Sequence, residues 1–474
     1  MSDGLFDKLK DYSESDFYPF HMPGHKRNFE KGALAGAYRY DITEIDGFDN
    51  LHQPVSLIKE AQERAARLYR SEETYFLING STAGILSAIS AVAGEGRNLI
   101  IGRNCHKAVY HAAFLNRMKL HYVYPEKTDG YDIAGPVLAD GIEKQIKKII
   151  GKEEFKDKGA GETIAGIVIT SPTYEGINSN IKEISRLAHS YKIPLIVDQA
   201  HGAHFGMHPK YPLGAVKEGA DIVIHSVHKT LPAPTQTALI HRNGSLTDGE
   251  ALKRYLRIYQ SSSPSYLLMA GIDEAMRFAE AEGSQRLEKL LGMREFFLKQ
   301  VESCRHIRVC PVTEPGKLVI SVDESFMSGQ MLYDILREKY HLQMEMAAGS
   351  YVVAILTMMD EKSGFDRLSE ALLEIDKGTE ADKRHVCRFD VPANPVAAME
   401  LWEAYTLPYE EKALTGAAGK TAAEFINLYP PGIPLLVPGE IIGEGMIRVI
   451  EGYIMNGYTV QGVCNNKIRV VKTS

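Results

Sequence analysis

The sequence predicts an α/β protein whose largest domain holds a mostly parallel sheet. Short apolar runs alternate with amphipathic segments from residue 74 to about 240, which is typical of strands joined by helices. Several runs are apolar throughout, as expected of strands that are covered on both faces. A chain of 474 residues also exceeds one ordinary core, so we expect two or three domains.

Six strands are expected in the first domain, each a short apolar run: TYFLIN (74–79), NLIIG (98–102), IAGIVIT (164–170), PLIVD (194–198), DIVIH (221–225) and TALIH (237–241). Helical patterns lie between them, for example IKEISRLAHSYK (181–192). Ligands of such sheets bind outside the carboxyl ends of the strands. The residues that directly follow these runs are therefore the candidates for a functional site.

A smaller α+β domain and a C-terminal α+β domain are expected next. Two helical stretches (266–282 and 285–302) precede KLVISV (317–322), a helix near 330–340, YVVAIL (351–356) and a helix near 365–376. The polar run 376–390 indicates a boundary. The predicted organisation is an N-terminal arm (1–40), a large α/β domain (41–265), a small domain (266–378) and a C-terminal domain (385–474).

Composition and charge exclude several classes of function. The net charge of −7, without a long basic run, argues against nucleic acid and an anionic membrane surface as partners. No stretch approaches the roughly 20 apolar residues of a membrane span, and the polar N-terminus lacks a signal-peptide core. The five scattered cysteines form no CxxC pair, and the histidines of HGAHFGMH (201–208) complete no ligand set, so no metal is expected. A reducing, cytoplasmic compartment fits best.

The motif INGSTAG (78–84) predicts a helix start after the first strand. Glycine turns the chain there, and Ser81 and Thr82 open a helix whose free N–H groups can hold a phosphate. Taken alone, the motif favours simple N-capping by serine or threonine, because such caps are common.

Two charged residues follow buried strands. Asp198 ends one strand, so its carboxylate needs a cationic or hydrogen-bonding partner; magnesium binding and helix capping are the alternatives. Lys229 follows the run DIVIH, where a lysine is seldom buried without a reason. It is either a surface lysine on the turn before Pro232 or an amine that binds an aldehyde covalently.

Together with His106 of GRNCHKAVYH (102–111), these residues are the parts needed to hold pyridoxal 5'-phosphate. Lys229 is expected to bind the aldehyde. Asp198 is expected to keep the pyridine nitrogen protonated, since opposite charges ~3 Å apart attract by roughly 5 kcal/mol at an effective dielectric of ~20. The remaining residues would hold the phosphate (Ser81, Thr82 and Ser226) and cover the two ring faces (His106 and Ala200). A lone histidine at such a place is more often a hydrogen-bonding helix start.

These motifs resemble those of the fold-type-I, pyridoxal-phosphate-dependent Orn/Lys/Arg decarboxylase family. The similarity runs from about 20 to about 440 and comprises, in the family's order, FHMPGHKR (20–27), INGSTAG, RNCHKAVYH, VDQAHGAHFG, SVHKTLPAPTQ and YPPGIPLLVPGE (429–440). It implies a sheet of the PLP-dependent transferase (aspartate aminotransferase-like) type. It also implies α-decarboxylation of a basic L-amino acid to an amine and carbon dioxide, with arginine or lysine favoured and ornithine next.

The resemblance further implies roles and partners. His228 is expected to help reprotonate the substrate carbon, and Glu440 to bind the cationic tail of the substrate, in the neighbouring subunit's site. Subunits are expected to form a homodimer or a larger homo-oligomer. Because the chain starts near the catalytic core, without the response-regulator-like domain of longer members, a dimer or tetramer is expected rather than a decamer.

Two other functions stay open on the sequence. The same fold type hosts aminotransferases and β-eliminating lyases, and a catalytically silent homologue could act by binding alone. Neither the tail length of the substrate nor a physiological role such as polyamine biosynthesis can be read from these residues.

Overall fold

The computed structural model describes residues 4–472 except 95, 129, 132, 324–325, 379–393, 429–431 and 456. A seven-stranded sheet, in the order β1-β7-β6-β5-β4-β2-β3, forms the centre of the large domain. Its strands are β1 (Glu73–Leu77), β2 (Asn98–Gly102), β3 (Lys119–Val123), β4 (Ile164–Thr170), β5 (Leu195–Asp198), β6 (Ile222–Ser226) and β7 (Ala238–Arg242). Neighbours from β6 to β3 pair in parallel, whereas β7 is antiparallel to β1 and β6. The predicted α/β class is confirmed.

Helices cover both faces of this sheet, which explains why its strands are apolar throughout. One face packs against α4 (Gly80–Val92), α5 (Lys107–Leu115) and α10 (Gly249–Tyr259), and the other against α6 (Ala139–Ile150) and α8 (Ile181–Ser190). Along β2, Leu99 and Ile101 belong to the first layer and Ile100 to the second. Successive strand residues point to opposite faces, so every position of this strand is buried.

Strand β3 was not among the expected strands. Its sequence, KLHYV, places lysine and histidine among apolar residues, and four of its five side chains are only half-buried. It lies at the edge of the sheet beside β2. An edge strand needs no continuous apolar run, because part of its surface faces solvent.

The two helices expected near 266–282 and 285–302 are one helix, α11 (Tyr266–Val301), so that prediction was wrong. Gly283 and Ser284 suggested a break, since glycine disfavours a helix interior. Gly283 is buried, and a β-carbon there would lie 3.9 Å from both Met207 and Met358. These distances are ordinary van der Waals contacts, so the helix continues through a glycine whose place a larger residue could also fill.

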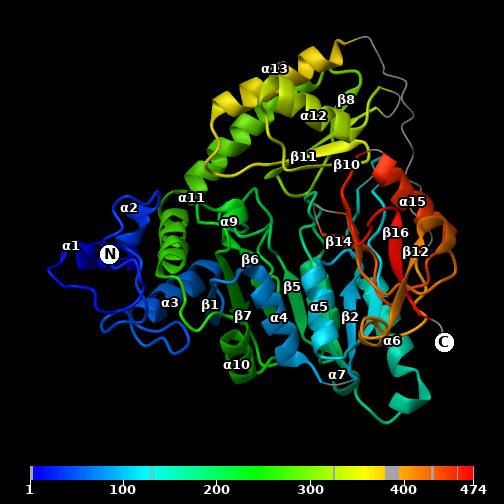
Figure 1. Cartoon of the computed structure of the whole chain (residues 1–474), viewed down its shortest axis with the longest axis horizontal. Helices are drawn as coiled ribbons and strands as arrows, with labels where there is room; N and C mark the ends of the chain where they lie inside the picture. Colours follow the sequence, from blue (N-terminus) through cyan, green and yellow to red (C-terminus); the bar gives the residue numbers. More distant parts are fainter. Residues whose placement is uncertain are drawn as a thin grey trace.

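The small unit contains a four-stranded sheet in the order β10-β11-β9-β8. Its elements are β8 (Ile307–Val309), β9 (Lys317–Val322), α12 (Gly329–Tyr340), β10 (Met346–Ala348), β11 (Tyr351–Ile355) and α13 (Lys362–Asp376). Figure 1 shows this unit at the top of the view, connected to the large sheet by the long helix α11. The start of β9 faces the carboxyl edge of the large sheet, where the candidate site lies.

The C-terminal unit consists of two small sheets and short helices. Its elements are α14 (Leu401–Ala404), β12 (Tyr409–Ala413), β13 (Ile426–Leu428), β14 (Ile433–Leu436), α15 (Glu444–Met455), β15 (Val460–Gln461) and β16 (Lys467–Val471). It lies beside α5 and β2 at the right of Figure 1. Most of the expected boundary at 376–390 falls outside the described residues, and the domain limits stay predictions.

The N-terminal segment contributes α1 (Leu5–Glu14), α2 (Ala35–Tyr38) and α3 (Leu57–Tyr69), of which α1 and α3 pack against α11. The short helices α7 (Ala160–Thr163) and α9 (Val227–Thr230) complete the large domain. Across the described ranges, no helix combines the length and apolar character that a bilayer crossing requires.

A buried carboxylate connects these N-terminal helices to α11. Asp273 is 1% exposed. It accepts hydrogen bonds from the backbone N–H of Leu5 (3.0 Å), Nε of Arg64 (3.1 Å) and Nε of Arg277 (3.3 Å). A buried charge is stable only when it is paired and hydrogen-bonded, so α1, α3 and α11 depend on one another through this group.

We predict that Asp273→Ala lowers the free energy of unfolding by about 3 kcal/mol, because two guanidinium groups lose a buried counter-charge. Urea denaturation monitored by circular dichroism measures the change. The matched control is Asp366→Ala in α13, whose partner Lys362 is 65% exposed. That variant should change stability by less than about 1 kcal/mol, and equal losses in both variants would contradict the prediction.

Candidate active site

The carboxyl ends of neighbouring strands bring the predicted site residues to one edge of the sheet. The ladder pairs Thr170 with Asp198 and Asp198 with Ile224, so Asp198 and Ser226 end adjacent strands. Lys229 follows in α9, directly after β6. Segments that lie far apart in the chain therefore meet here because the strands are parallel and in register.

Lys229 is half-buried, and its Nζ lies 3.0 Å from Nε2 of His201. Burial lowers the pKa of Lys229, and the carboxylates of Asp198 and Glu345 oppose this shift only in part. A lowered pKa increases the fraction of neutral amine. That is the form that attacks a carbonyl carbon.

Asp198 is buried at the end of β5, and its Oδ1 accepts a hydrogen bond from the N–H of Ala200 (3.2 Å). Burial raises the pKa of this carboxyl group, whereas the nearby charge of Lys229 lowers it. Ala200 itself is buried beside it. The site thus contains an acid and an amine that influence each other's ionisation.

The predicted phosphate residues converge from two elements. The hydroxyl oxygens of Ser81 in α4 and Ser226 at the end of β6 lie 2.7 Å apart. Gly80 has a φ of +73°, a conformation that glycine adopts readily at this turn. The side chain of Asn79, which precedes the helix, accepts a hydrogen bond from Ser261 and not from the first turn of α4. Thr82 is exposed in the same turn.

His106 starts α5 and does cap it, because its Nδ1 accepts a hydrogen bond from the N–H of Ala108 (3.2 Å). Burial and the charge of Lys229 lower the pKa of His106 to about 4, so the ring is neutral near pH 7. The structure therefore shows His106 as the N-cap of α5, with its ring close enough to Lys229 to be influenced by its charge. Its covering of a cofactor ring stays a prediction.

His228 lies next to Lys229, and its Nδ1 is 2.9 Å from the carbonyl oxygen of Thr237. A carbonyl only accepts hydrogen bonds, so Nδ1 carries the hydrogen and Nε2 keeps the lone pair. Burial lowers the pKa of this ring, partly offset by the bond to Thr237. His228 is thus a neutral base at Nε2.

Glu440 lies away from these groups, in a buried pair with Arg103. It is 1% exposed, and its Oε2 accepts hydrogen bonds from Nη2 of Arg103 (3.0 Å) and the N–H of Val437 (2.8 Å). Burial raises the pKa of Glu440 and Arg103 opposes the shift. Arg103 also donates to the carbonyls of Pro434 (2.7 Å) and Leu435 (3.2 Å). The predicted contact of Glu440 with a substrate stays a prediction.

Three residues of this site, His201, Lys317 and Tyr174, were missed by the sequence reasoning. His201 contacts Lys229 through Nε2 and Lys317 through Nδ1, which is 2.8 Å from the lysine Nζ. The ring of Tyr174 packs edge-on against His201, with centroids 4.7 Å apart. The sequence feature that could have identified Lys317 is its place at the start of the apolar strand KLVISV. A charged side chain that is buried there requires a partner.

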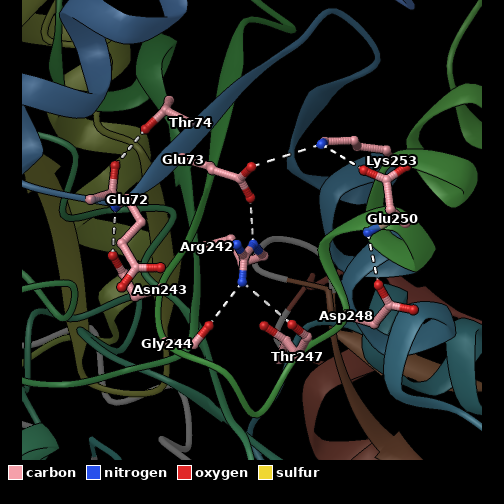
Figure 2. A network of polar contacts seen from close by, with 11 residues as sticks. Glu72, Glu73, Thr74, Arg242, Asn243, Gly244, Thr247, Asp248, Glu250 and Lys253 are labelled. Atoms are coloured by element: carbon pink, nitrogen blue, oxygen red, sulfur yellow. Dashed lines mark hydrogen bonds and ion pairs between the residues drawn. The ribbon is translucent and has the colours of Figure 1, made fainter.

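A separate cavity of about 430 Å³ lies between α3, β1 and α10. Three of its charged side chains are paired: Glu73 binds Arg242 and Lys253, and Lys253 also binds Glu250. Figure 2 shows this network along the ends of β1 and β7. The predicted site residues do not line this cavity, so it is not our candidate.

Comparison with known proteins gives consistent matches along the chain. The family model described as Orn/Lys/Arg decarboxylase, major domain, matches residues 3–363, and the model of the C-terminal domain of that family matches residues 391–456. An arginine decarboxylase of Bacillus subtilis is 31% identical over 486 residues, which covers 99% of this chain and 97% of the relative.

Solved structures agree in fold. The crystal structure of the Francisella novicida lysine decarboxylase LdcF has a TM-score of 0.85 at 19% identity and covers 99% of this chain and 81% of its own. A structure of SPT with PLP has a TM-score of 0.53 at 13% identity, over 67% of this chain and 76% of its own. The expected PLP-dependent transferase type of fold is thereby confirmed.

The buried pair of Arg103 and Glu440 joins the C-terminal unit to the end of β2, three residues before His106. We predict that Arg103→Met accelerates backbone hydrogen exchange at 435–440 by about 100-fold, because a buried carboxylate loses its counter-charge. Mass spectrometry of exchanged peptides measures the effect. Arg469→Met is the control, since Arg469 is 43% exposed in its pair with Glu424. Unchanged exchange in Arg103→Met would contradict the prediction.

Proposed function

This chain belongs to the Orn/Lys/Arg decarboxylase family, and on that premise we propose that it removes the α-carboxylate of a basic L-amino acid with pyridoxal phosphate as cofactor. Arginine or lysine is the favoured substrate, with ornithine next, and the products are the amine and carbon dioxide. The observation that carries the proposal is Lys229, a half-buried amine at the carboxyl edge of the sheet with a lowered pKa.

The residues present fit this cofactor. A phosphate needs several donors, and the hydroxyls of Ser81 and Ser226 meet at 2.7 Å beside the uncapped start of α4. A pyridine nitrogen needs an acidic side chain as its partner. Asp198 is buried, and the nearby charge of Lys229 lowers the pKa of its carboxyl group. When bound, the cofactor supplies an aldehyde for Lys229 and a cationic ring that accepts the electrons of the breaking bond.

The protein's own groups then hold and move protons. The negative charge of Asp198 would keep the ring nitrogen protonated. The attraction between the two charges is stronger when they are shielded from water. His228 has its hydrogen fixed on Nδ1 by Thr237. Any proton that His228 takes up must therefore sit on Nε2, and it would return to the substrate carbon from that atom. Lys229, once released, is the second candidate donor.

The proposal includes a homodimer or a larger homo-oligomer in the cytoplasm, with polyamine biosynthesis as one possible role. Several large apolar side chains of the N-terminal segment are exposed in the single chain, which supports a subunit contact there: Phe17, Tyr18, Phe20, Met22 and Phe29. Glu440 remains a candidate for the cationic tail of the substrate. Its Oε1 is buried without a hydrogen-bond partner among the described residues, so it can still accept one.

The test of the function is carbon dioxide release from purified protein supplied with pyridoxal phosphate and, separately, arginine, lysine or ornithine. We expect one substrate to exceed the others, since a site that hydrogen-bonds one tail leaves buried groups unpaired with another. Identification of the amine product by mass spectrometry names the substrate. A keto acid in place of carbon dioxide would indicate transamination, and no product from any substrate would contradict the proposal.

Lys229→Ala should lower turnover by more than about 1,000-fold, because the amine that binds the cofactor is lost. Borohydride reduction followed by peptide mass spectrometry should detect cofactor bound to Lys229 in the natural protein and none in the variant. Lys182→Ala is the matched control: an exposed lysine of α8 in the same domain. Full activity in Lys229→Ala would overturn the assignment.

A further inference from the structure

Tyr174, in the loop after β4, connects the region around Lys229 to the small unit. Its ring packs edge-on against the ring of His201, with centroids 4.7 Å apart, and its hydroxyl donates a hydrogen bond to Oε1 of Glu345. Nε2 of His201 in turn lies 3.0 Å from Nζ of Lys229. Two side chains therefore bridge the amine of Lys229 and the carboxylate of Glu345.

Glu345 directly precedes β10, and its backbone is anchored in the small sheet. Its N–H donates to the carbonyl of Val353 in β11 (2.9 Å), and its neighbours Met344 and Met346 are buried. Glu345 itself is exposed. The structure thus holds the main chain in place and leaves the carboxylate accessible to a ligand that enters from solvent.

Glu345 differs from the other carboxylates of this region. Four carboxyl groups are close enough to Lys229 or Lys317 to influence the pKa of these lysines. All but Glu345 are buried: Asp198, Glu175 and Glu314. In the part of the chain that the structure describes, Glu345 forms no ion pair, and the one hydrogen-bond partner of its carboxylate is the hydroxyl of Tyr174. Its negative charge therefore lacks a cationic partner in the single chain.

The position of Glu345 relative to the cofactor residues leaves room for a substrate. The substrate amine would replace Nζ of Lys229 as the partner of the aldehyde, so the substrate side chain starts at this position. The groups that would hold the cofactor come from the large domain: Ser81, Asp198 and Ser226. The small unit faces these groups across the carboxyl edge of the sheet, and Glu345 is its accessible carboxylate beside Tyr174.

We propose that Glu345 determines the specificity for basic amino acids by binding the cationic tail of the substrate, and that Tyr174 is a positioning residue that orients this carboxylate. The hydroxyl of Tyr174 uses one lone pair of Oε1. The remaining lone pairs can accept hydrogen bonds from an ammonium or a guanidinium group. A neutral side chain of the same length offers no such donor. The inference rests on the proposed function for the class of substrate.

The test compares each basic amino acid with a neutral analogue: lysine with norleucine, arginine with citrulline and ornithine with norvaline. Calorimetry on the full-length chain supplied with pyridoxal phosphate measures the dissociation constants, in the Lys229→Ala background, where the proposed turnover is removed. Glu345→Gln keeps the size of the side chain and an acceptor for Tyr174 but removes the charge. We expect it to weaken binding of the basic amino acid by roughly 10- to 100-fold and to leave binding of the neutral analogue unchanged.

Two further variants sharpen the comparison. Glu370→Gln is the matched control, because Glu370 is an exposed carboxylate of α13 in the same small unit, and its loss should change neither constant. Tyr174→Phe keeps the ring against His201 and removes the hydroxyl. It should weaken binding of the basic amino acid by about 5-fold, since the carboxylate loses the hydrogen bond that orients it. This variant tests the same carboxylate without altering it.

An equal loss of affinity for the basic amino acid and its neutral analogue in Glu345→Gln would indicate a structural role and overturn the inference. Unchanged affinity for both would overturn it as well, and a selective loss in Glu440→Gln alone would assign the tail to Glu440 instead. The inference also fails if no basic amino acid binds while Glu345 is present. Because calorimetry detects binding without carbon dioxide release, failure of the decarboxylation assay and failure of this inference are distinguishable.

Discussion

The parallel register of β4, β5 and β6 is the constraint on which the rest of the site depends. It places Thr170, Asp198 and Ile224 side by side across three strands, so the segments after β5 and β6 leave the sheet at the same level. A shift of one residue in β5 would turn the Asp198 side chain to the opposite face of the sheet. The two apolar layers that cover this sheet oppose such a shift, because it would exchange the side chains that pack in the two layers.

Buried charges connect the separate units of the molecule. Asp273 holds the N-terminal helices on α11, and the pair of Arg103 and Glu440 holds the C-terminal unit on the end of β2. Glu314 contacts His204 across the boundary between the small unit and the large domain. The carboxyl groups of Asp273, Glu440 and Glu314 are each nearly inaccessible to water, so the loss of their hydrogen-bonding partners is strongly destabilising. The same electrostatic rule therefore accounts for both the assembly of the fold and the protonation states in the site.

The sequence predicts the centre of this fold better than its edges. Three expected strands, at 98–102, 164–170 and 317–322, have the observed bounds. A short, continuously apolar run is compatible with few structures other than a buried strand. Strand β3 could not be recognised in the same way, since its half-buried residues carry no such pattern. The residues after β2, β5 and β6 were identified as site candidates from their positions alone. The contact of His201 with Lys317 spans 116 residues, and no local pattern in one chain predicts it.

The site is divided between the large domain and the small unit, and this division affects the contact between His201 and Lys317. Asp198, Ser226 and Lys229 all come from the large sheet, and their relative positions are set by its register. Lys317 comes from the small unit, so its distance from His201 depends on how that unit rests on the large domain through Gly176 and Glu314. A movement of the small unit away from the sheet would lengthen the contact between Lys317 and His201 and leave the imidazole free to change tautomer. The contact between Lys317 and His201 therefore depends on the seating of the small unit, whereas the geometry of Asp198 and Ser226 does not.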